Sequence, residues 1–254
     1  MGQELEAEQD WRLQAVTTLA QAFADRETGH AFEAGSLVTL TAPVHFDRNS
    51  LLILPVPNGT ALFLSMSRRS YEEASKLLAS CQRDANHEDL LLFKDDNRAI
   101  DFLENMAGAV ISACAALEAF ANEFIPSGFR YEIARKDGKC TEIYAKEQIE
   151  RYVSLDDKLG RVLPTALGVE SPKGEQAWSG YVRIRRLRDR LLHLKAQDRA
   201  PTPARPDSVW NALATCPPPH LAAKGVLDYF VKHLPVAPRW ASHYPCDFSG
   251  PTPD

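Results

Sequence analysis

Two stretches of the 254-residue chain carry apolar residues at the three- and four-residue spacing of a core-facing α-helix. The first runs from Asn97 to Phe124, where Pro126 and Gly128 end it. The second runs from about Lys173 to Lys195. The two apolar stripes are Met106, Val110, Ala113, Leu117, Phe120 and Phe124, and Trp178, Tyr181, Ile184, Leu187, Leu191 and Leu194. We predict that these stripes pack against each other.

The first 95 residues have a mixed pattern. Trp11, Ala15, Leu19 and Phe23 fall near one face of a helix, which predicts an amphipathic helix over Leu5–Ala24. The β-branched, apolar run Ser36–Phe46 predicts a strand. Asn58-Gly59 lies between the apolar runs "SLLILPVP" and "TALFLSMS", and this arrangement predicts a hairpin. A helix capped by Ser70 follows.

Signals for turns, helix ends and a linker divide the chain after the first long helix. Asp137-Gly138 lies in "FRYEIARKDGKCTEIYA" and predicts a hairpin turn. Ser154 is a capping signal for "SLDDKLGRVLPTAL", which ends at Gly168. The proline-rich linker "APTPARPD" separates the second long helix from a last helix over His220–Leu234.

These elements predict a mostly α-helical protein with a β-hairpin insertion. We expect residues 1–95 to form a small α+β unit, a helix plus an antiparallel sheet. Residues 96–254 are expected to form a helical bundle with a proline-rich C-terminal extension, whose tail "SGPTPD" has the composition of a disordered segment.

Composition gives general limits. The chain is 44% hydrophobic and 25% charged, which is ordinary globular usage, and it has no run of about eighteen apolar residues. Its acidic N-terminus is unlike a signal peptide, and five scattered cysteines favour reduced thiols, so we expect a cytoplasmic protein without a membrane span. The net charge of −5 gives no general affinity for nucleic acid, so a polyanion would need a local basic patch.

One metal site has to be weighed. Cys216, His220, His243 and Cys246 have spacings that a Cys2His2 zinc site could use. Their surroundings, "CPPPH" and "HYPC", are rich in proline and lack a usual zinc-finger pattern. We therefore expect these residues to lie in loops, and we expect no metal and no cofactor.

Glu118 and Asn122 stack on one face of the first long helix, because they are four residues apart. The small residues around them, Ala115, Ala116, Ala119 and Ala121, permit another helix to approach closely. A carboxylate in this setting is either at the margin of the apolar stripe or held by a buried partner, since a lone buried charge is costly. A solvated Glu118 on the outer face is the alternative.

The second long helix is rich in arginine. Arg183, Arg185, Arg186, Arg188, Arg190 and Lys195 are opposed only by Asp189. Such an excess attracts phosphates, although a solvated basic face that balances acidic helices is the usual explanation of a charge run. His30, His87 and His243 each have an arginine four residues before them, so an arginine about one turn before a histidine is by itself a weak signal. Only His193 lies inside a strongly patterned helix.

The sequence "RDRLLH", Arg188–His193, resembles the signature of the HEPN superfamily (higher eukaryotes and prokaryotes nucleotide-binding domains). That signature is an arginine followed by a polar residue, with four to six residues before a histidine. "AALEAFANEF" and "SLDDKLGRVL" also resemble companion segments of these domains. The resemblance covers about residues 97–197 and implies a helical bundle. The hairpin near Asp137 and the proline-bearing tail depart from it.

The resemblance implies a metal-independent endoribonuclease of a toxin–antitoxin or other host-defence system. It also implies RNA and an antitoxin or other defence-system protein as partners. It implies His193 for proton transfer and Arg188 for phosphate stabilisation. Asp189 would orient the imidazole, while Glu118 and Asn122 would hold Arg188 or contact RNA. Arg185, Arg190 and Lys195 would bind the RNA backbone. A catalytically silent HEPN module that binds a protein or a nucleotide is the alternative.

The geometry of an α-helix does not by itself bring Arg188 and His193 together. His193 lies five positions after Arg188, so the two positions differ by about 140° around an ideal helix. The long arginine side chain, a distorted turn or a second subunit would have to bring the two groups together. In the family two bundles commonly pair so that both motifs line one cleft, and we therefore expect a homodimer.

Overall fold

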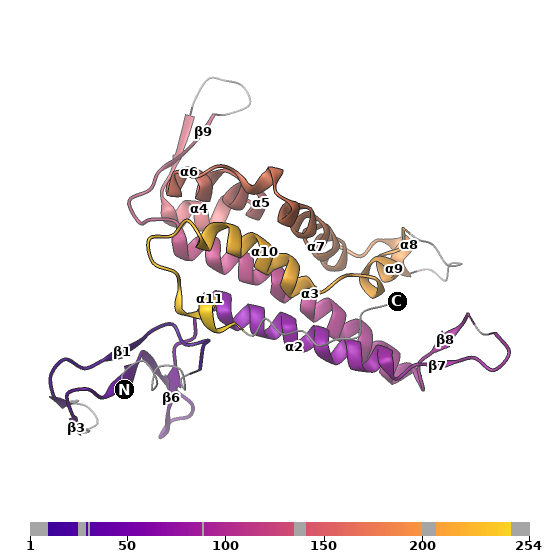
Figure 1. Cartoon of the computed structure of the whole chain (residues 1–254), viewed down its shortest axis with the longest axis horizontal. Helices are drawn as coiled ribbons and strands as arrows, with labels where there is room; N and C mark the ends of the chain where they lie inside the picture. Colours follow the sequence, from indigo (N-terminus) through magenta and orange to yellow (C-terminus); the bar gives the residue numbers. More distant parts are fainter. Residues whose placement is uncertain are drawn as a thin grey trace.

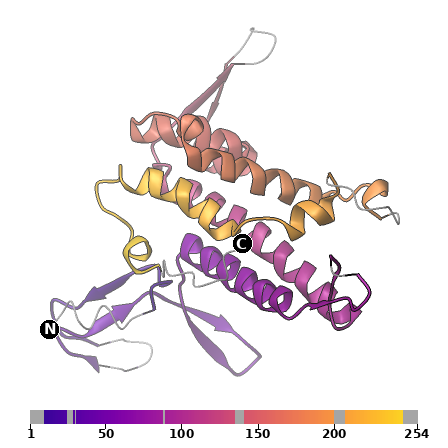
Figure 2. The same cartoon turned by 45° about the vertical axis from the view of Figure 1, so that its right-hand side comes forward.

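The computed structural model describes residues 10–24, 29, 31–87, 89–134, 141–199 and 207–244. Helices dominate this part of the chain, which confirms the prediction of a mostly α-helical protein (Figure 1). The long helices pack on one another as a bundle, seen from a second side in Figure 2. They are α2 (Gly59–Ala79), α3 (Asp96–Phe124), α7 (Gln176–Leu192) and α10 (Pro219–Val231).

Helix α3 is the central element and contacts α2, α7 and α10. It begins where Asp95 caps it, because the Asp95 carboxylate accepts a hydrogen bond of 2.9 Å from the backbone N–H of Arg98. Its buried face includes Met106, Val110, Leu117 and Phe120. The predicted contact between the apolar stripes of α3 and α7 is confirmed.

By length and composition alone α3 is also long and apolar enough to cross a membrane, with a hydropathy of 1.4 over its best 18-residue window. Half of that window is buried inside the molecule. Core helices of soluble proteins meet the same criterion, so it is weak evidence for a membrane span.

Helix α7 lies closely on α10 because two glycines face alanines. A Cβ atom added to Gly180 would lie 3.2 Å from the Cβ of Ala222, and one added to Gly225 would lie 3.1 Å from the Cβ of Ala177. Side chains at either glycine would push the two helices apart. The bounds of both helices differ by a few residues from those predicted, 173–195 and 220–234.

The predicted hairpin at Asn58-Gly59 is wrong, because Asn58 caps helix α2. Its side-chain oxygen accepts a hydrogen bond of 3.0 Å from the backbone N–H of Ala61, and its amide donates to the Glu123 carboxylate at 3.0 Å. Asparagine serves in tight turns and as a helix cap, and here tertiary contacts select the cap. Ser70 accordingly lies inside α2 and does not begin a helix.

Helix α2 belongs to the same hydrophobic core as α3. Ala61, Leu64 and Ala74 of α2 join the buried cluster that contains Phe102 and Val110 of α3. A Cβ atom added to Gly59 would lie 3.2 Å from the Cβ of Ala119, so α2 makes a close approach at one of the alanines of α3. The core therefore continues across the predicted boundary near residue 95.

The predicted helix over Leu5–Ala24 is wrong in its described part, which begins at residue 10. A turn is followed there by strands, because Val16, Thr17 and Thr18 are β-branched and pair with residues 37–39. The short strands pair antiparallel, β1 with β4, β2 with β3, and β5 with β6. They are β1 (Val16–Thr18), β2 (Phe23–Ala24), β3 (Ala31–Phe32), β4 (Leu37–Thr39), β5 (Thr41–His45) and β6 (Leu51–Pro55). The strand predicted over Ser36–Phe46 is thus observed as β4 and β5.

Two more hairpins project from the bundle (Figure 1). Strands β7 (Gln82–Arg83) and β8 (Leu91–Leu92) pair between α2 and α3. Strands β9 (Tyr131–Ala134) and β10 (Thr141–Tyr144) form the predicted hairpin insertion, in which Tyr131 pairs with Tyr144. The expected turn at Asp137-Gly138 lies outside the described residues.

Short helices connect the hairpin insertion to α7. Ser154 caps α5, accepting a hydrogen bond of 3.2 Å from the backbone N–H of Asp157, and Gly168 ends α6 with a left-handed φ of 68°. Both signals were predicted. The elements are α4 (Lys146–Tyr152), α5 (Leu155–Asp157), the π-helical turn η1 (Lys158–Val162), α6 (Leu163–Leu167) and the 3₁₀ turn η2 (Pro172–Gly174).

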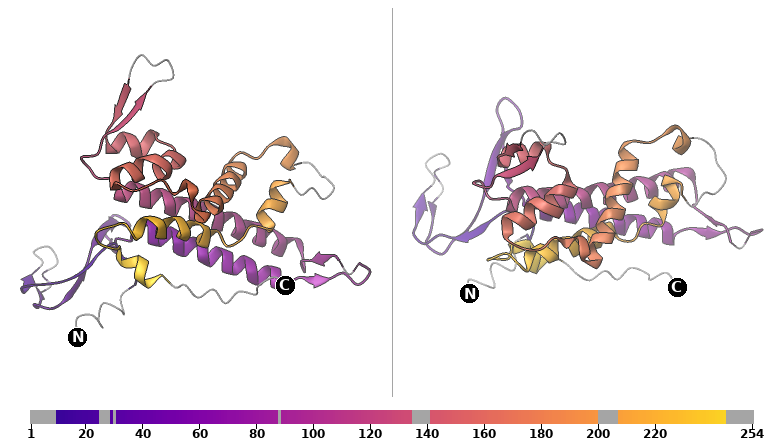
Figure 3. Two further views of the ribbon diagram at one scale, coloured as in Figure 1. Left: turned by 45° about the horizontal axis from the view of Figure 1, so that its top comes forward. Right: turned by 90° about the horizontal axis from the view of Figure 1, so that it is seen from above.

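Three small helices follow α7 in the chain. They are α8 (Ala196–Arg199), α9 (Val209–Ala214) and α11 (Arg239–His243). Helix α9 packs on α3 and α7 at one end of the bundle, as Figure 3 shows from two further sides. The linker residues 200–206 and the tail from residue 245 lie outside the described residues.

Candidate functional site

Helix α7 presents its basic side chains on two different sides. Its core-facing residues are Tyr181, Ile184 and Leu187, which are spaced by three residues and buried. Arg185 and Arg188 reach a polar network that involves α5. Arg183, Arg186 and Arg190 line a pocket on the other side, toward α9.

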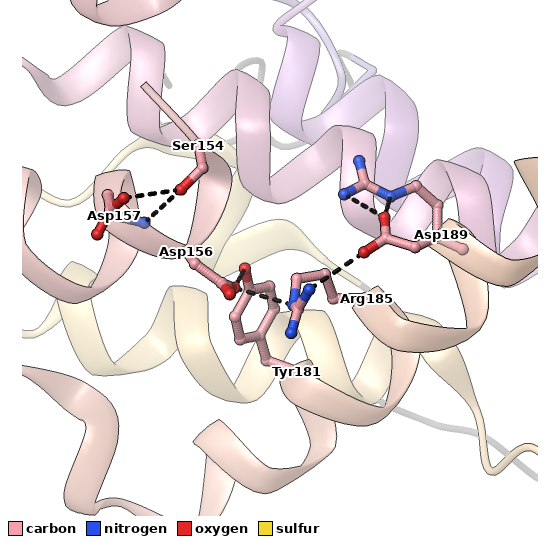
Figure 4. A network of polar contacts seen from close by, with 7 residues as sticks. Ser154, Asp156, Asp157, Tyr181, Arg185 and Asp189 are labelled. Atoms are coloured by element: carbon pink, nitrogen blue, oxygen red, sulfur yellow. Dashed lines mark hydrogen bonds and ion pairs between the residues drawn. The ribbon is translucent and has the colours of Figure 1, made fainter. Parts of the chain in front are cut away.

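The polar network joins α5 to α7 through alternating charges (Figure 4). The Nε atom of Arg185 forms an ion pair of 3.0 Å with Oδ1 of Asp156, and its Nη1 atom lies 3.1 Å from Oδ2 of Asp189. Nε of Arg188 donates to Oδ1 of Asp189 at 3.0 Å. The buried hydroxyl of Tyr181 donates to Asp156. Two arginines and two aspartates thus balance in charge.

The buried position of Tyr181 affects its acidity. Burial raises the pKa of the Tyr181 hydroxyl well above its usual value, and the hydrogen bond to Asp156 raises it further. The hydroxyl therefore stays protonated and serves as a fixed donor. Neither Tyr181 nor Asp156 was named as a site residue from the sequence, since nothing in the pattern of α7 indicated a partner on α5.

Glu118 and Asn122 bind Lys158 and make no ion pair or hydrogen bond with Arg188. The ammonium of Lys158 donates to the Glu118 carboxylate, to Oδ1 of Asn122 at 2.9 Å and to the backbone oxygen of Glu150 at 2.7 Å. The Lys158 side chain is fully buried, whereas that of Glu118 is 36% exposed. Of the alternatives left open for Glu118, the structure shows a buried partner, which is Lys158 and not Arg188. Contact of Glu118 or Asn122 with RNA, the other role implied by the family resemblance, stays a prediction.

Lys158 was not named as a site residue from the sequence, because its burial depends on the π-helical turn η1. It lies at the start of the π-helical turn in "SLDDKLGRVL", a segment in which a lysine next to aspartates resembles a solvated position. The three acceptors satisfy all three donors of the ammonium, which is the condition for burying it. Glu118 and Asn122 could have indicated such a partner, because a carboxylate and an amide stacked on a helix face of small residues need a polar group to bind.

His193 is the residue at which α7 ends. It has φ −129° and ψ 54°, and its backbone N–H donates to the carbonyl oxygens of Asp189 at 3.2 Å and Arg190 at 3.3 Å. Its imidazole is exposed and has no hydrogen bond or ion pair with the described residues. Asp189 was expected to orient this imidazole, but its carboxylate instead binds Arg185 and Arg188.

Arg190 ties the end of α7 to the segments that follow it. Its Nη2 atom lies 3.2 Å from Oδ1 of Asp198, a side chain only 4% exposed, and its Nη1 atom donates to the backbone oxygen of Asp207 at 2.9 Å. Lys195 contributes a backbone N–H to the same carboxylate at 3.1 Å, while its residue surface is exposed. Of the three residues expected to bind RNA, Lys195 is free of ion pairs in the described part, and Arg185 and Arg190 are bound to aspartates.

A pocket of about 570 Å³ lies between α7 and α9, and we call it the α7–α9 pocket. Arg183 and Arg186 are exposed on its wall and form no ion pair with any described residue. The lining residues are Ser179, Val182, Arg183, Arg186, Leu187, Arg190, Asn211, Ala212 and Thr215, and none is acidic. The sequence signal was available, because Arg183, Arg186 and Arg190 recur at the spacing of one helix face.

The residues weighed as zinc ligands do not form a cluster in the part of the chain that is described, where no group of three or more metal-ligating side chains occurs. Cys246 lies outside that part. The expectation that they lie in loops is wrong for His220, which lies in α10, and for His243, which is the last residue of α11. His220 is buried beside Tyr71, with 5.8 Å between ring centroids, and burial lowers its pKa to about 4. Nδ1 of His243 lies 2.9 Å from the backbone oxygen of Arg239.

Two buried thiols are also unsuited to chemistry. Burial raises the pKa of Cys114 to about 12 and that of Cys216 to about 11. Both thiols stay protonated at neutral pH, and a protonated thiol is a poor nucleophile. Within the arginine-rich region of α7, the exposed imidazole of His193 and the basic side chains remain as groups able to act on a ligand.

Comparisons of the chain with protein-family models, with curated proteins and with solved structures found no match. The resemblance to HEPN domains therefore stays a prediction, carried by the motifs of α3, α5 and α7.

Proposed function

We propose that the protein is a metal-independent endoribonuclease of the HEPN type, active as a homodimer in the cytoplasm, and an effector of a toxin–antitoxin or other host-defence system. The observation that carries the proposal is the exposed imidazole of His193 at the end of α7, one turn beyond Arg188 in a helix rich in arginine. A histidine whose imidazole makes no hydrogen bond or ion pair with the described residues is available to exchange protons with a ligand.

The reaction suits these groups. The 2′-oxygen of a ribose attacks the neighbouring phosphorus, the bond from phosphorus to the 5′-oxygen breaks, and a 2′,3′-cyclic phosphate forms. One proton leaves the 2′-hydroxyl and one joins the departing 5′-oxygen, and His193 carries out proton transfer. Arg188 stabilises the charge that builds on the phosphoryl oxygens through paired hydrogen bonds.

A second subunit supplies the missing geometry. On an ideal helix positions 188 and 193 lie about 140° apart, and Asp189 holds the Arg188 guanidinium within its own chain. A two-fold axis between two α7 helices would bring Arg188 of one chain toward His193 of the other with a single self-complementary surface. The Arg188 side chain is 28% exposed, so its free edge remains open to a phosphate.

A catalytically silent module is the alternative, and a specific observation favours it. Arg188, Asp189, Arg185 and Asp156 form a charge-balanced network, and Glu118 and Asn122 bind Lys158. If these contacts only hold the bundle together, the protein binds a partner through α7 without cleaving RNA.

RNA cleavage by His193→Ala distinguishes the two proposals. We expect wild-type protein to cleave RNA in excess EDTA and to leave 2′,3′-cyclic ends, and we expect His193→Ala to lose cleavage while keeping its melting temperature. His87→Ala is the matched control, since His87 is also exposed and follows an arginine in the chain. Loss of activity with EDTA, or equal cleavage by His193→Ala, would contradict the proposal.

A further inference from the structure

The α7–α9 pocket has a chemical character that the proposed reaction does not use. Its volume of about 570 Å³ falls within the range of about 300–1,000 Å³ that is typical of small-molecule sites. Three guanidinium groups, those of Arg183, Arg186 and Arg190, belong to one wall. The described lining contains no carboxylate to neutralise them.

The three arginines differ in how much charge they offer. Arg190 is paired with Asp198 and bound to the Asp207 backbone, so it is held in place and largely neutralised. Arg183 and Arg186 have no such partner in the described part of the chain, and both are exposed. Uncompensated arginines that share a concave wall create a positive field that concentrates anions.

Spacing along the helix indicates the length of the anion. Arg183 and Arg190 are seven residues apart, which corresponds to a rise of about 10 Å, and Arg186 lies between them. A row of this length suits two or more phosphoryl groups better than one, because each guanidinium can pair with one phosphate through two hydrogen bonds.

The remaining lining suits the body of a nucleotide. Val182, Leu187 and Ala212 provide an apolar surface. The hydroxyls of Ser179 and Thr215 donate to backbone oxygens at 2.8 Å, which leaves their oxygen lone pairs as acceptors for ribose hydroxyls. An apolar floor with a few placed polar groups is the usual composition of such sites.

We propose that the α7–α9 pocket binds a nucleotide ligand with at least two phosphoryl groups. The ligand is either a free nucleoside diphosphate or a stretch of RNA with consecutive phosphates. The proposal does not depend on cleavage. On an ideal helical wheel, position 193, directly after the last residue of α7, lies about 20° from Arg186 but about 140° from Arg188, which places Arg186 and position 193 on one side of the helix. Where RNA is the ligand, the pocket holds backbone next to the proposed catalytic histidine.

Binding is measured by calorimetry on the full chain with four probes: AMP, ADP, pyrophosphate and a short 2′-O-methyl RNA, which has no free 2′-hydroxyl to react. We expect ADP or the oligonucleotide to bind about tenfold or more tightly than AMP, because a second phosphoryl group engages a second arginine. Binding of ADP identifies a free nucleotide as a ligand, and binding of the oligonucleotide alone identifies the RNA backbone.

Variants locate the site. The double variant Arg183→Gln, Arg186→Gln should weaken binding of the preferred probe by about tenfold or more, because the paired hydrogen bonds from both guanidinium groups to phosphate are lost. Thr215→Trp should also weaken it by filling the pocket while every arginine remains. Arg161→Gln is the matched control, because Arg161 is an exposed arginine away from the pocket, with a side chain 65% exposed.

Three results would overturn the inference. They are no binding of any probe at millimolar concentration, binding that survives the double variant, and equal losses in Arg161→Gln and the double variant. Unchanged melting temperatures of the variants show that a loss of binding is not a loss of folding. A protein that binds ADP but cleaves no RNA would support the pocket while contradicting the proposed ribonuclease.

Discussion

The contact between Lys158 and Glu118 gives a quantitative prediction about stability. Glu118→Gln removes the negative partner of a fully buried ammonium but keeps the size of the side chain. Breaking a buried ion pair by removing one partner typically costs about 3–5 kcal/mol, since a buried charge is left uncompensated. Lys158 would still donate to Asn122 at 2.9 Å and to the Glu150 backbone at 2.7 Å.

The expected loss is smaller than for a pair that is buried on both sides. The Glu118 side chain is 36% exposed, so water screens part of its attraction to Lys158. We expect Glu118→Gln to lower the free energy of unfolding by about 2–3 kcal/mol. For a chain of this size that corresponds to a fall in melting temperature of about 4–12 °C.

Lys158→Met supplies the second half of the test. Methionine fills similar space without a charge, and Glu118 can turn its exposed carboxylate to water, so this variant should cost about 0–2 kcal/mol. In the Lys158→Met background Glu118→Gln should have almost no effect, because no buried ammonium remains. The coupling between the two substitutions should therefore be about 2–3 kcal/mol.

Urea unfolding of the four proteins, followed by circular dichroism, measures this cycle. Glu123→Gln is a poor control because Glu123 binds Asn58, whereas Glu147→Gln alters an exposed glutamate of α4 and should be close to neutral. Additive effects of the two substitutions would show that Lys158 does not depend on Glu118, and the assignment of the pair would be wrong.

Two further predictions concern buried titratable groups. Unfolded His220 takes up a proton near pH 6.5 and folded His220 only near pH 4, so the unfolded chain binds more protons between these values. Stability should therefore fall by about 3 kcal/mol as the pH drops from about 6.5 to 4, and denaturant melts of His220→Gln should show a smaller fall. Cys114 and Cys216, whose pKa values burial raises, should react with iodoacetamide only after unfolding, as mass spectrometry would show; fast labelling of either thiol in the native protein would contradict their burial.

The strongly periodic helices were predictable because local signals and packing agree in them. Helix α3 was expected over 97–124 and runs over 96–124, with a cap at Asp95 and a buried stripe at the expected positions. Ser154 and Gly168 also act as the sequence indicated. At these places no tertiary contact opposes the local preference.

The errors lie where one local signal is compatible with two structures. Asn58-Gly59 fits a tight turn and a helix start equally well, and the hydrogen bond from Asn58 to Glu123, 65 residues away, belongs to the second. Trp11, Ala15, Leu19 and Phe23 fit a helix in their apolar spacing, but the β-branched residues Val16, Thr17 and Thr18 between them favour the strand that pairs with residues 37–39. Long-range partners of this kind are not visible in local spacing.

The candidate site was predictable in its residue types but not in its pairings. Asp189 was expected to orient His193 but binds Arg185 and Arg188, and Glu118 has a charged partner in Lys158. The identity of that partner depends on the π-helical turn that buries Lys158, and the identity of the second ligand of Arg185 depends on how α5 meets α7. Both follow from tertiary packing.

The central claim, that "RDRLLH" forms a ribonuclease site shared by two chains, is tested most directly by mixing two inactive variants. Arg188→Ala and His193→Ala each lack one group, but a mixed dimer contains one site with Arg188 from one chain and His193 from the other. After subunit exchange at equal concentrations, we expect RNA cleavage to return to about a quarter of the wild-type rate, since half of the dimers carry one intact site of two. Separate variants that are inactive and a mixture that stays inactive, although mixed dimers form, would contradict the shared site.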